Sequence, residues 1–194
     1  MRLLYLTLLL FIACQTSKNP ALPIVTAIQN GQLTLADGST RAVPHYGDPA
    51  YTIIYLVRHC EKGKDGTRDP ELSPEGRARA ERLGKVMDKA RIDRICTTSF
   101  KRTIATGAAV QYWAGGPPTE TFPMEAQPDW LSETLPTAGG QSLFYVGHTN
   151  TIPQLLNQLV GKDQFHDLPE EDFGRLYIAI TKGVGQTEVL ELQY

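Results

Sequence analysis

The chain has 194 residues, of which 41% are hydrophobic and 21% are charged, and this composition is typical of a single globular domain rather than a disordered or fibrous protein. Its 19 basic and 21 acidic residues give a formal net charge of −2, so the charge balance does not favour a nucleic-acid binder. Three cysteines without a C-x-x-C pair argue against a disulfide scaffold and a zinc ribbon.

The start of the chain is typical of an export signal. Arg2 precedes an apolar run, residues 3–12, that is too short to cross a bilayer as a helix. Residues 11–14 (FIAC) resemble the lipobox of bacterial lipoproteins, with Phe11 in place of the usual Leu. The sequence therefore predicts cleavage before Cys14 and acylation of Cys14, which would anchor an exported protein to a membrane surface on its periplasmic or outer side. A plain signal peptide with an incidental cysteine is the alternative.

A short β-rich extension is predicted between the signal and the main domain. Two apolar segments, residues 24–28 and 33–35, flank Asn30-Gly31, a pair that favours a tight hairpin turn because both residues accept a positive φ. An irregular extension is the alternative. The chain thus divides into a signal peptide (1–13), a tether with a β-rich extension (14–50) and a main domain (51–194).

In the main domain, short apolar runs alternate with amphipathic segments. The predicted elements are a strand at 51–57, a helix from Ser73-Pro74, a strand at 94–97, a helix at 99–113, strands at 121–124 and 142–146, a helix across 152–159 that ends at Gly161, and strands at 175–181 and 187–194. Strands that alternate with helices predict an α/β fold: a three-layer sandwich whose mostly parallel sheet is flanked by helices. Pro123 favours an edge or an end of the sheet for its strand.

Histidines and arginines follow three of the predicted strands. Arg58-His59 end the first strand, Arg102 lies in the helix after the second, and His148 follows the fourth. Because ligands of such sheets bind at the carboxyl ends of the strands, we expect these side chains to meet there. Arginine offers a planar fork of donors for phosphate oxygens, and histidine can be a nucleophile near neutral pH. The pattern favours a phosphate site, although each residue alone is as readily a structural hydrogen-bonding group.

Four short motifs resemble those of the histidine phosphatase superfamily, which has the phosphoglycerate-mutase-like fold. They are residues 56–62 (LVRHCEK), 69–76 (DPELSPEG), 98–103 (TSFKRT) and 146–150 (VGHTN). The resemblance extends over residues 51–194, with the motifs in the family's order.

The resemblance implies a role for each matching residue. His59 corresponds to the nucleophile that becomes phosphohistidine, and Arg58, Arg102 and His148 correspond to the pocket that holds the phosphoryl group. Phosphoryl transfer depends mainly on positioning and on positive charge around the phosphoryl oxygens. Two guanidinium groups and a protonated His148 would supply that charge, so no metal and no cofactor is implied.

A general acid is the least defined part of the expected site. Residues 131–133 (LSE) resemble the family's "L-x-E" element, which makes Glu133 the first candidate and Asp129 the second. Both could equally be solvated loop residues, and some small family members lack an obvious acid.

Cys60 is a departure from the family, which usually has Gly or Ala beside the nucleophile. A buried thiol can pack as a small apolar residue, so the fold should tolerate it. The alternatives are a disulfide between Cys60 and Cys96 and a nucleophilic role for Cys60. Two free thiols without a catalytic role are favoured over both.

The expected activity is hydrolysis of a phosphomonoester through a phosphohistidine intermediate. Only 45 residues separate Arg102 from His148, which resembles the compact branch with protein phosphohistidine phosphatases and leaves little room for a lid. The substrate would be a phosphorylated small molecule or protein, with no nucleic acid involved. Phosphoglycerate-mutase-type transfer and a tethered phosphate-binding module without activity are the alternatives.

Overall fold

A computed structural model describes residues 21–194, so the predicted signal and Cys14 lie outside the described residues. The elements are β1 (Val25–Gln29), β2 (Gln32–Leu35), β3 (Thr40–Ala42), β4 (Thr52–Arg58), α1 (Pro74–Val86), β5 (Arg94–Thr98), α2 (Lys101–Ala114), β6 (Thr119–Phe122), η1 (Met124–Ala126), α3 (Gln127–Thr134), η2 (Leu135–Thr137), β7 (Ser142–Gly147), α4 (Thr151–Val160), β8 (Arg175–Thr181) and β9 (Thr187–Gln193). Within this range no helix combines the length and hydropathy needed to cross a bilayer.

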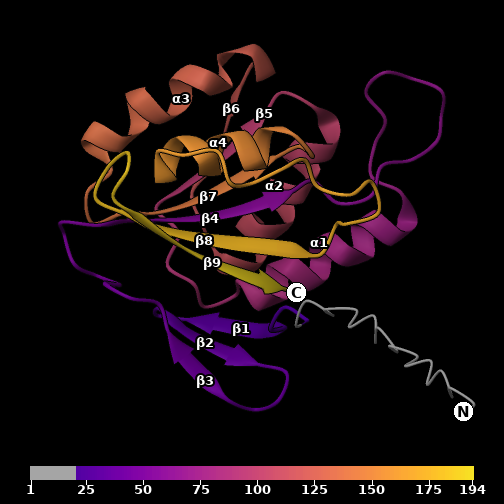
Figure 1. The fold of residues 1–194 in the computed structure, drawn as a ribbon. Coiled ribbons are helices and arrows are strands. Elements are labelled where there is room, and N and C mark those ends of the chain that lie inside the picture. The colour runs from indigo at the N-terminus through magenta and orange to yellow at the C-terminus, as the bar shows by residue number, and fades with distance from the viewer. Residues whose placement is uncertain (1–20) are drawn as a thin grey trace, which may run out of the picture.

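The main sheet is mixed and has six strands in the order β6-β5-β7-β4-β8-β9 (Figure 1). The four strands from β6 to β4 are parallel, whereas β8 and β9, which correspond to the last two predicted strands, form an antiparallel hairpin. The expected α/β fold is therefore confirmed. The sheet is mixed because β8 pairs antiparallel with the central strand β4.

Helices cover both faces of this sheet, which gives the predicted three layers. Alternate residues of β4 face opposite sides: Tyr55 packs in a cluster with α1 and α2, and Leu56 packs in a cluster with α3 and α4. Both side chains are fully buried. This burial on both faces explains why the predicted strand at 51–57 is continuously apolar.

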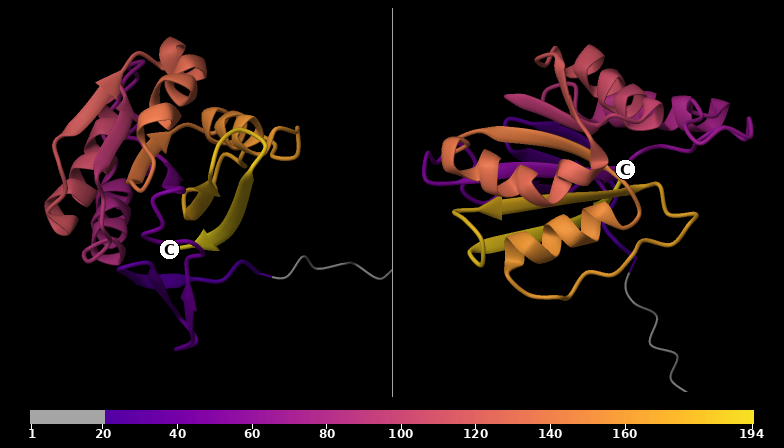
Figure 2. Two further views of the ribbon diagram at one scale, coloured as in Figure 1. Left: turned by 90° about the vertical axis from the view of Figure 1, so that its left-hand side faces the viewer. Right: turned by 90° about the horizontal axis from the view of Figure 1, so that it is seen from above.

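The N-terminal extension is a separate antiparallel sheet in the order β1-β2-β3 (Figure 2). The turn between β1 and β2 is the predicted Asn30-Gly31, and both residues have a positive φ. Val25, Ile28 and Leu33 are buried in the same cluster as α1, and Ile24 forms a parallel bridge with Gln193 of β9. The small β extension is thus confirmed, and it packs on the main domain.

The segment between β6 and β7 differs most from the prediction. Sequence patterns gave a strand at 121–124, but β6 ends at Phe122, and the helical segments η1, α3 and η2 follow. The expected edge position is correct, because β6 is the outermost strand of the parallel part. Trp130 and Leu131 of α3 are buried against the sheet, with the Trp130 ring 4.8 Å from the ring centroid of Tyr145.

Candidate phosphate-binding site

The register of two parallel strands brings both predicted histidines together. Arg58 at the end of β4 lies opposite Gly147 at the end of β7, so His59 and His148, the next residues on each strand, share one edge of the sheet. The backbone N–H of His59 donates to the carbonyl of Gly147 at 3.0 Å. The two imidazole centroids are 5.3 Å apart.

His59 is held with one ring nitrogen free of a proton. Its Nδ1 lies 2.7 Å from the carbonyl oxygen of Cys60, and because a carbonyl only accepts, Nδ1 carries the proton. Nε2 then has a lone pair, which accepts a hydrogen bond from Nε of Arg102 at 3.2 Å. Burial lowers the pKa of His59 to about 3, so the ring is neutral at neutral pH. This is the protonation state that a nitrogen nucleophile requires.

His148 is fixed through its Nε2 atom. Thr98 Oγ1 lies 2.8 Å from Nε2, and Thr103 Oγ1 lies 3.0 Å from Thr98 Oγ1. Nδ1 has no hydrogen-bond partner within residues 21–194 and is available to a ligand. Burial, followed by the positive charges of Arg102 and Arg58, lowers the pKa of His148 to about 4. Unless an anion lies beside it, His148 is therefore neutral at neutral pH, and a bound anion would favour the protonated form that the sequence analysis expects.

Arg58 is a buried cation with a specific set of acceptors. Its Nη1 donates to the carbonyl oxygens of Pro169 at 3.0 Å and Glu170 at 2.7 Å. The guanidinium carbon lies 4.0 Å from the ring centroid of Phe173. Nε of Arg58 is buried and has no hydrogen-bond partner within the described residues. Since an unpaired buried donor is costly, this atom is suited to an incoming anion.

Arg102 approaches the same place from the first turn of α2. Its Nη1 lies 3.5 Å from Oδ1 of Asp69, and its guanidinium stacks 4.3 Å from the ring centroid of Phe100. The Asp69 carboxylate also accepts from the backbone N–H of Lys101 at 3.0 Å, which ties the loop before α1 to the start of α2. These contacts fix the guanidinium while its Nε donates to Nε2 of His59.

These four residues line one cavity of about 380 Å³ at the carboxyl edge of the sheet. Its full lining is Arg58, His59, Lys62, Arg68, Phe100, Arg102, Met124, His148, Thr149, Asn150 and Glu170. Four basic side chains face one carboxylate, and two neutral imidazoles lie among them. A small cavity with convergent guanidinium donors is suited to a phosphoryl group.

Comparison with known proteins agrees with this geometry. The family model described as histidine phosphatase superfamily (branch 1) matches residues 54–123, which include His59 and Arg102. Residues 54–123 are therefore similar to the histidine phosphatase superfamily. No curated protein sequence matches this chain.

Solved structures share the fold of this chain at low sequence identity. The phosphohistidine phosphatase SixA from Agrobacterium tumefaciens has a TM-score of 0.56 and 22% identity, with coverage of 75% of this chain and 99% of that one. Phosphoglycerate mutase from Bacillus anthracis has a TM-score of 0.55 and 14% identity, with coverage of 72% and 91%. A phosphoserine phosphatase from Entamoeba histolytica has a TM-score of 0.53 and 15% identity, with coverage of 71% and 94%.

The two cysteines among the described residues are buried thiols. Cys60 and Cys96 are both free, so the structure does not contain the alternative disulfide. Burial raises the pKa of Cys60 to about 11 and that of Cys96 to about 12, which keeps both protonated at neutral pH. Cys60 packs with Leu72 and Ala80, as expected of a small apolar residue.

The structure does not bring the expected acid into the cavity. Glu133 and Asp129 lie on α3 with exposed side chains and are absent from the cavity lining. The lining contains instead a carboxylate that sequence reasoning missed, Glu170, in the loop between α4 and β8. No local pattern distinguishes Glu170 from a solvated loop residue, because its place depends on the contact between Arg58 and this distant loop.

No metal cluster is evident in the same part of the chain. Within residues 21–194 no group of three or more His, Cys, Asp and Glu side chains is placed to hold an ion.

Proposed function

We propose that this protein is a histidine phosphatase, which hydrolyses phosphomonoesters through a phosphohistidine intermediate on His59. The observation that carries the proposal is the unprotonated Nε2 of His59, which faces the guanidinium of Arg102 inside a cavity that also contains Arg58 and His148. A neutral nucleophile among fixed cations is the arrangement that phosphoryl transfer needs.

The reaction has two displacements. In the first, the Nε2 lone pair of His59 attacks phosphorus, and the bond to the leaving oxygen breaks. Arg58 and Arg102 hold the equatorial oxygens, and Nδ1 of His148 is the further donor once the negative phosphoryl group favours its protonation. In the second, water attacks phosphorus, and the P–N electrons return to Nε2. The proton of His59 stays on Nδ1 throughout, where it is donated to the Cys60 carbonyl.

The fold does not select the substrate among phosphomonoesters. Its structural relatives are described as acting on phosphohistidine, phosphoserine and phosphoglycerate, so the fold is compatible with several leaving groups. The proposed substrate is a phosphorylated small molecule or protein side chain. Mutase activity is the second candidate, disfavoured for an exported protein because phosphoglycerate is a cytoplasmic metabolite. A module that binds phosphate without turnover is the third.

Trapping the intermediate tests the proposal. Radiolabelled para-nitrophenyl phosphate is mixed with the enzyme and quenched in base, where a phosphohistidine P–N bond survives. We expect label on the peptide that contains His59, and loss of both label and turnover in His59→Ala. His148→Ala should retain the label while its rate falls by about 10²–10³-fold, the usual loss for one charge-stabilising donor. His166→Ala, an exposed histidine outside the cavity, is the control and should match the wild type.

Three results would contradict the proposal. Near-normal turnover by His59→Ala would exclude His59 as the nucleophile, and turnover without label would exclude the covalent step. Loss of turnover in a chelator, with recovery on adding a divalent ion, would contradict a mechanism in which arginines supply the positive charge.

The proposal for location rests on the N-terminal sequence alone. We propose that Cys14 is acylated and holds the enzyme on the periplasmic or outer side of a membrane. The wild type should enter the detergent phase in a partition experiment, and Cys14→Ser should stay in the aqueous phase. A wild-type protein that stays in the aqueous phase would overturn the anchor.

A further inference from the structure

The cavity of the proposed phosphatase contains a single carboxylate, and it comes from a loop rather than from the segment between Arg102 and His148. This carboxylate is Glu170, which lines the cavity with an exposed side chain. It has no ion-pair partner within residues 21–194. Its charge acts on the nearby guanidinium of Arg58, but no ion pair fixes its carboxyl group, which is accessible to a ligand and to water.

The main chain at residue 170 is fixed to the phosphate-binding arginine. Nη1 of Arg58 donates to the carbonyls of Pro169 and Glu170 at 3.0 and 2.7 Å, and Phe173 stacks on the same guanidinium. The hydroxyl of Tyr194 donates to the carbonyl of Phe173 at 3.0 Å, which ties the loop to the end of the chain. A phosphoryl group bound by Arg58 would therefore lie close to residue 170, because the same arginine holds the main chain of that residue.

Two other carboxylates near the cavity, Glu61 and Asp69, are paired with arginines. Oε1 of Glu61 accepts from Arg79, with Nη2 of Arg79 at 2.7 Å. Asp69 accepts from Arg102 at 3.5 Å and from the backbone N–H at the start of α2. A carboxylate held by a guanidinium is stabilised in its ionised form and is a poor proton donor. Glu170 thus differs from Glu61 and Asp69 in having no ion pair within the described residues, and from Glu171 in lining the phosphate cavity as well as the groove.

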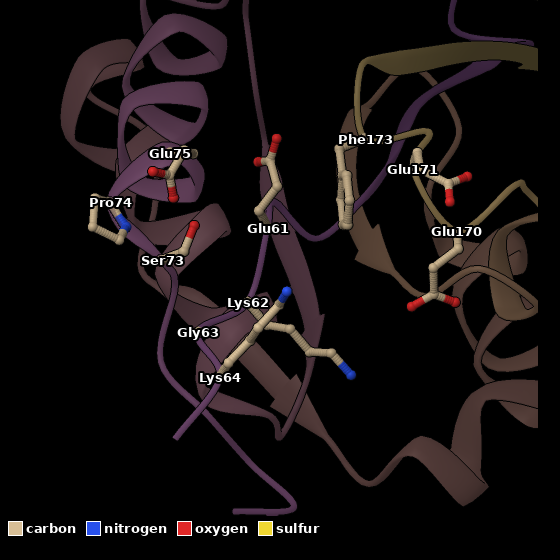
Figure 3. A pocket seen from close by; sticks show the side chains of 10 residues that line it. All are labelled: Glu61, Lys62, Gly63, Lys64, Ser73, Pro74, Glu75, Glu170, Glu171 and Phe173. Carbon is tan, nitrogen blue, oxygen red and sulfur yellow. The ribbon is translucent and has the colours of Figure 1, made fainter. Parts of the chain in front are cut away.

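A groove beside the cavity shows where a leaving group would lie. Its volume is about 620 Å³, and Glu170 and Lys62 line both the groove and the phosphate cavity. Figure 3 shows Glu170, Glu171 and Phe173 on one side of the groove, facing Glu61 and the segment around Lys62 on the other. A phosphorylated molecule with its phosphoryl group in the cavity can extend its leaving group into the groove. The scissile oxygen would then lie at the junction, beside Glu170.

We propose that Glu170 is the residue that transfers the proton in both displacements, an inference that rests on the proposed phosphatase function. In the first displacement, His59 attacks phosphorus, the P–O bond breaks, and the Glu170 carboxyl group gives its proton to the leaving oxygen. In the second, the Glu170 carboxylate takes a proton from water as its oxygen attacks phosphorus and the P–N bond breaks. The carboxyl group is thereby protonated again, and phosphate is released.

The dependence of rate on the leaving group tests this role. An alkyl phosphate needs protonation of its leaving oxygen, whereas para-nitrophenyl phosphate does not, because nitrophenolate is a stable anion. In Glu170→Gln we expect kcat/KM for methyl phosphate to fall by about 10²–10⁴-fold, the usual contribution of a general acid. For para-nitrophenyl phosphate, kcat/KM should be nearly unchanged, while kcat falls and base-stable phosphoenzyme accumulates because the second displacement lacks its base.

Glu171→Gln is the matched control, since this neighbour lines the groove but not the phosphate cavity. It should leave the ratio of kcat/KM for the two substrates at the wild-type value. Equal losses on both substrates in Glu170→Gln, no loss on either, or the same selective loss in Glu171→Gln would overturn the role of Glu170. A wild type that hydrolyses neither substrate would instead refute the proposed phosphatase function.

Discussion

Thr98 Oγ1 lies 2.8 Å from Nε2 of His148, and both residues are buried at the carboxyl edge of the sheet. A hydroxyl can donate to an unprotonated Nε2 or accept from a protonated one. When it accepts, its own proton can go to Thr103 Oγ1, which lies 3.0 Å away and in turn donates to the carbonyl of Thr98 or Phe100. Thr98 therefore supports His148 both before and after a phosphoryl anion favours its protonation, and the protonated ring has a proton on Nδ1 for the ligand.

Replacing Thr98 by Val should disturb His148 without removing it. Valine has a similar shape but no hydroxyl, so Nε2 of His148 loses its partner. An unpaired buried polar group costs about 1–3 kcal/mol, and a loss of that size in the transition state lowers kcat by about 10–100-fold. The measurement is kcat across pH for the wild type, Thr98→Val and Thr98→Ser. Thr98→Ser keeps the hydroxyl and should recover most of the rate, whereas equal rates in all three proteins would refute the positioning role.

The buried histidines should make the protein less stable in mild acid. The folded state holds His59 and His148 neutral, with pKa values lowered to about 3 and about 4, but the unfolded chain binds protons near the ordinary histidine pKa. Because the unfolded state then binds more protons, the free energy of unfolding falls with decreasing pH. The loss is about 1.4 kcal/mol per pH unit for each histidine between pH ~6.5 and its folded pKa. Denaturant unfolding at several pH values measures it.

His148→Gln provides the comparison for this pH effect, because a glutamine removes one of the two titrating groups. The unfolding free energy of His148→Gln should depend less steeply on pH than that of the wild type over the same pH range. The difference between the two slopes should be about 1.4 kcal/mol per pH unit. Parallel slopes in the wild type and His148→Gln would mean that His148 is protonated in the folded protein.

The sequence predicts the framework of the site better than its details. Arg58, His59 and His148 could be placed because continuous apolar runs mark β4 and β7, and because the residue that follows a buried parallel strand lies at a known edge. The resemblance of these segments to family motifs indicated phosphoryl transfer as the reaction. The pairing of β8 with β4 had no such signal, because an apolar strand of this kind can pair at several positions in a sheet.

Contacts made through the backbone of distant loops account for what was missed. Arg58 is 112 residues from Glu170, whose carbonyl it binds, and neither the spacing nor the composition of the loop indicates that bond. Glu133 was selected by resemblance to a short motif, but α3 packs through Trp130 and Leu131, and this arrangement leaves Glu133 exposed. Thr98 was recognised as part of a motif and not as the partner of His148, because the tautomer of a histidine is set by a neighbour in space.

Gly76 shows why the motif that begins α1 requires a residue without a side chain. A Cβ atom at this position would lie 2.1 Å from the carbonyl oxygen of Glu61, two residues after His59. That carbonyl already accepts from the backbone N–H of Ser73 at 2.9 Å, so rotating it away from Gly76 would break this hydrogen bond. The start of the helix and the segment after His59 are therefore in direct backbone contact, and extra volume between them must displace one of the two.

Gly76→Ala should for this reason destabilise the protein and slow turnover. In an ordinary helix the same change stabilises by about 1 kcal/mol, so the predicted sign is the opposite of helix propensity. We expect a loss of about 1–3 kcal/mol in unfolding free energy, typical of overpacking, and a lower kcat because the segment after His59 shifts. Gly63→Ala is the control: its Cβ would lie 3.4 Å from the carbonyl of Glu71, an ordinary contact, and its stability should stay near the wild-type value. Thermal and denaturant unfolding measure both variants, and a Gly76→Ala protein as stable as the wild type would show that the helix can move away from Glu61 without cost.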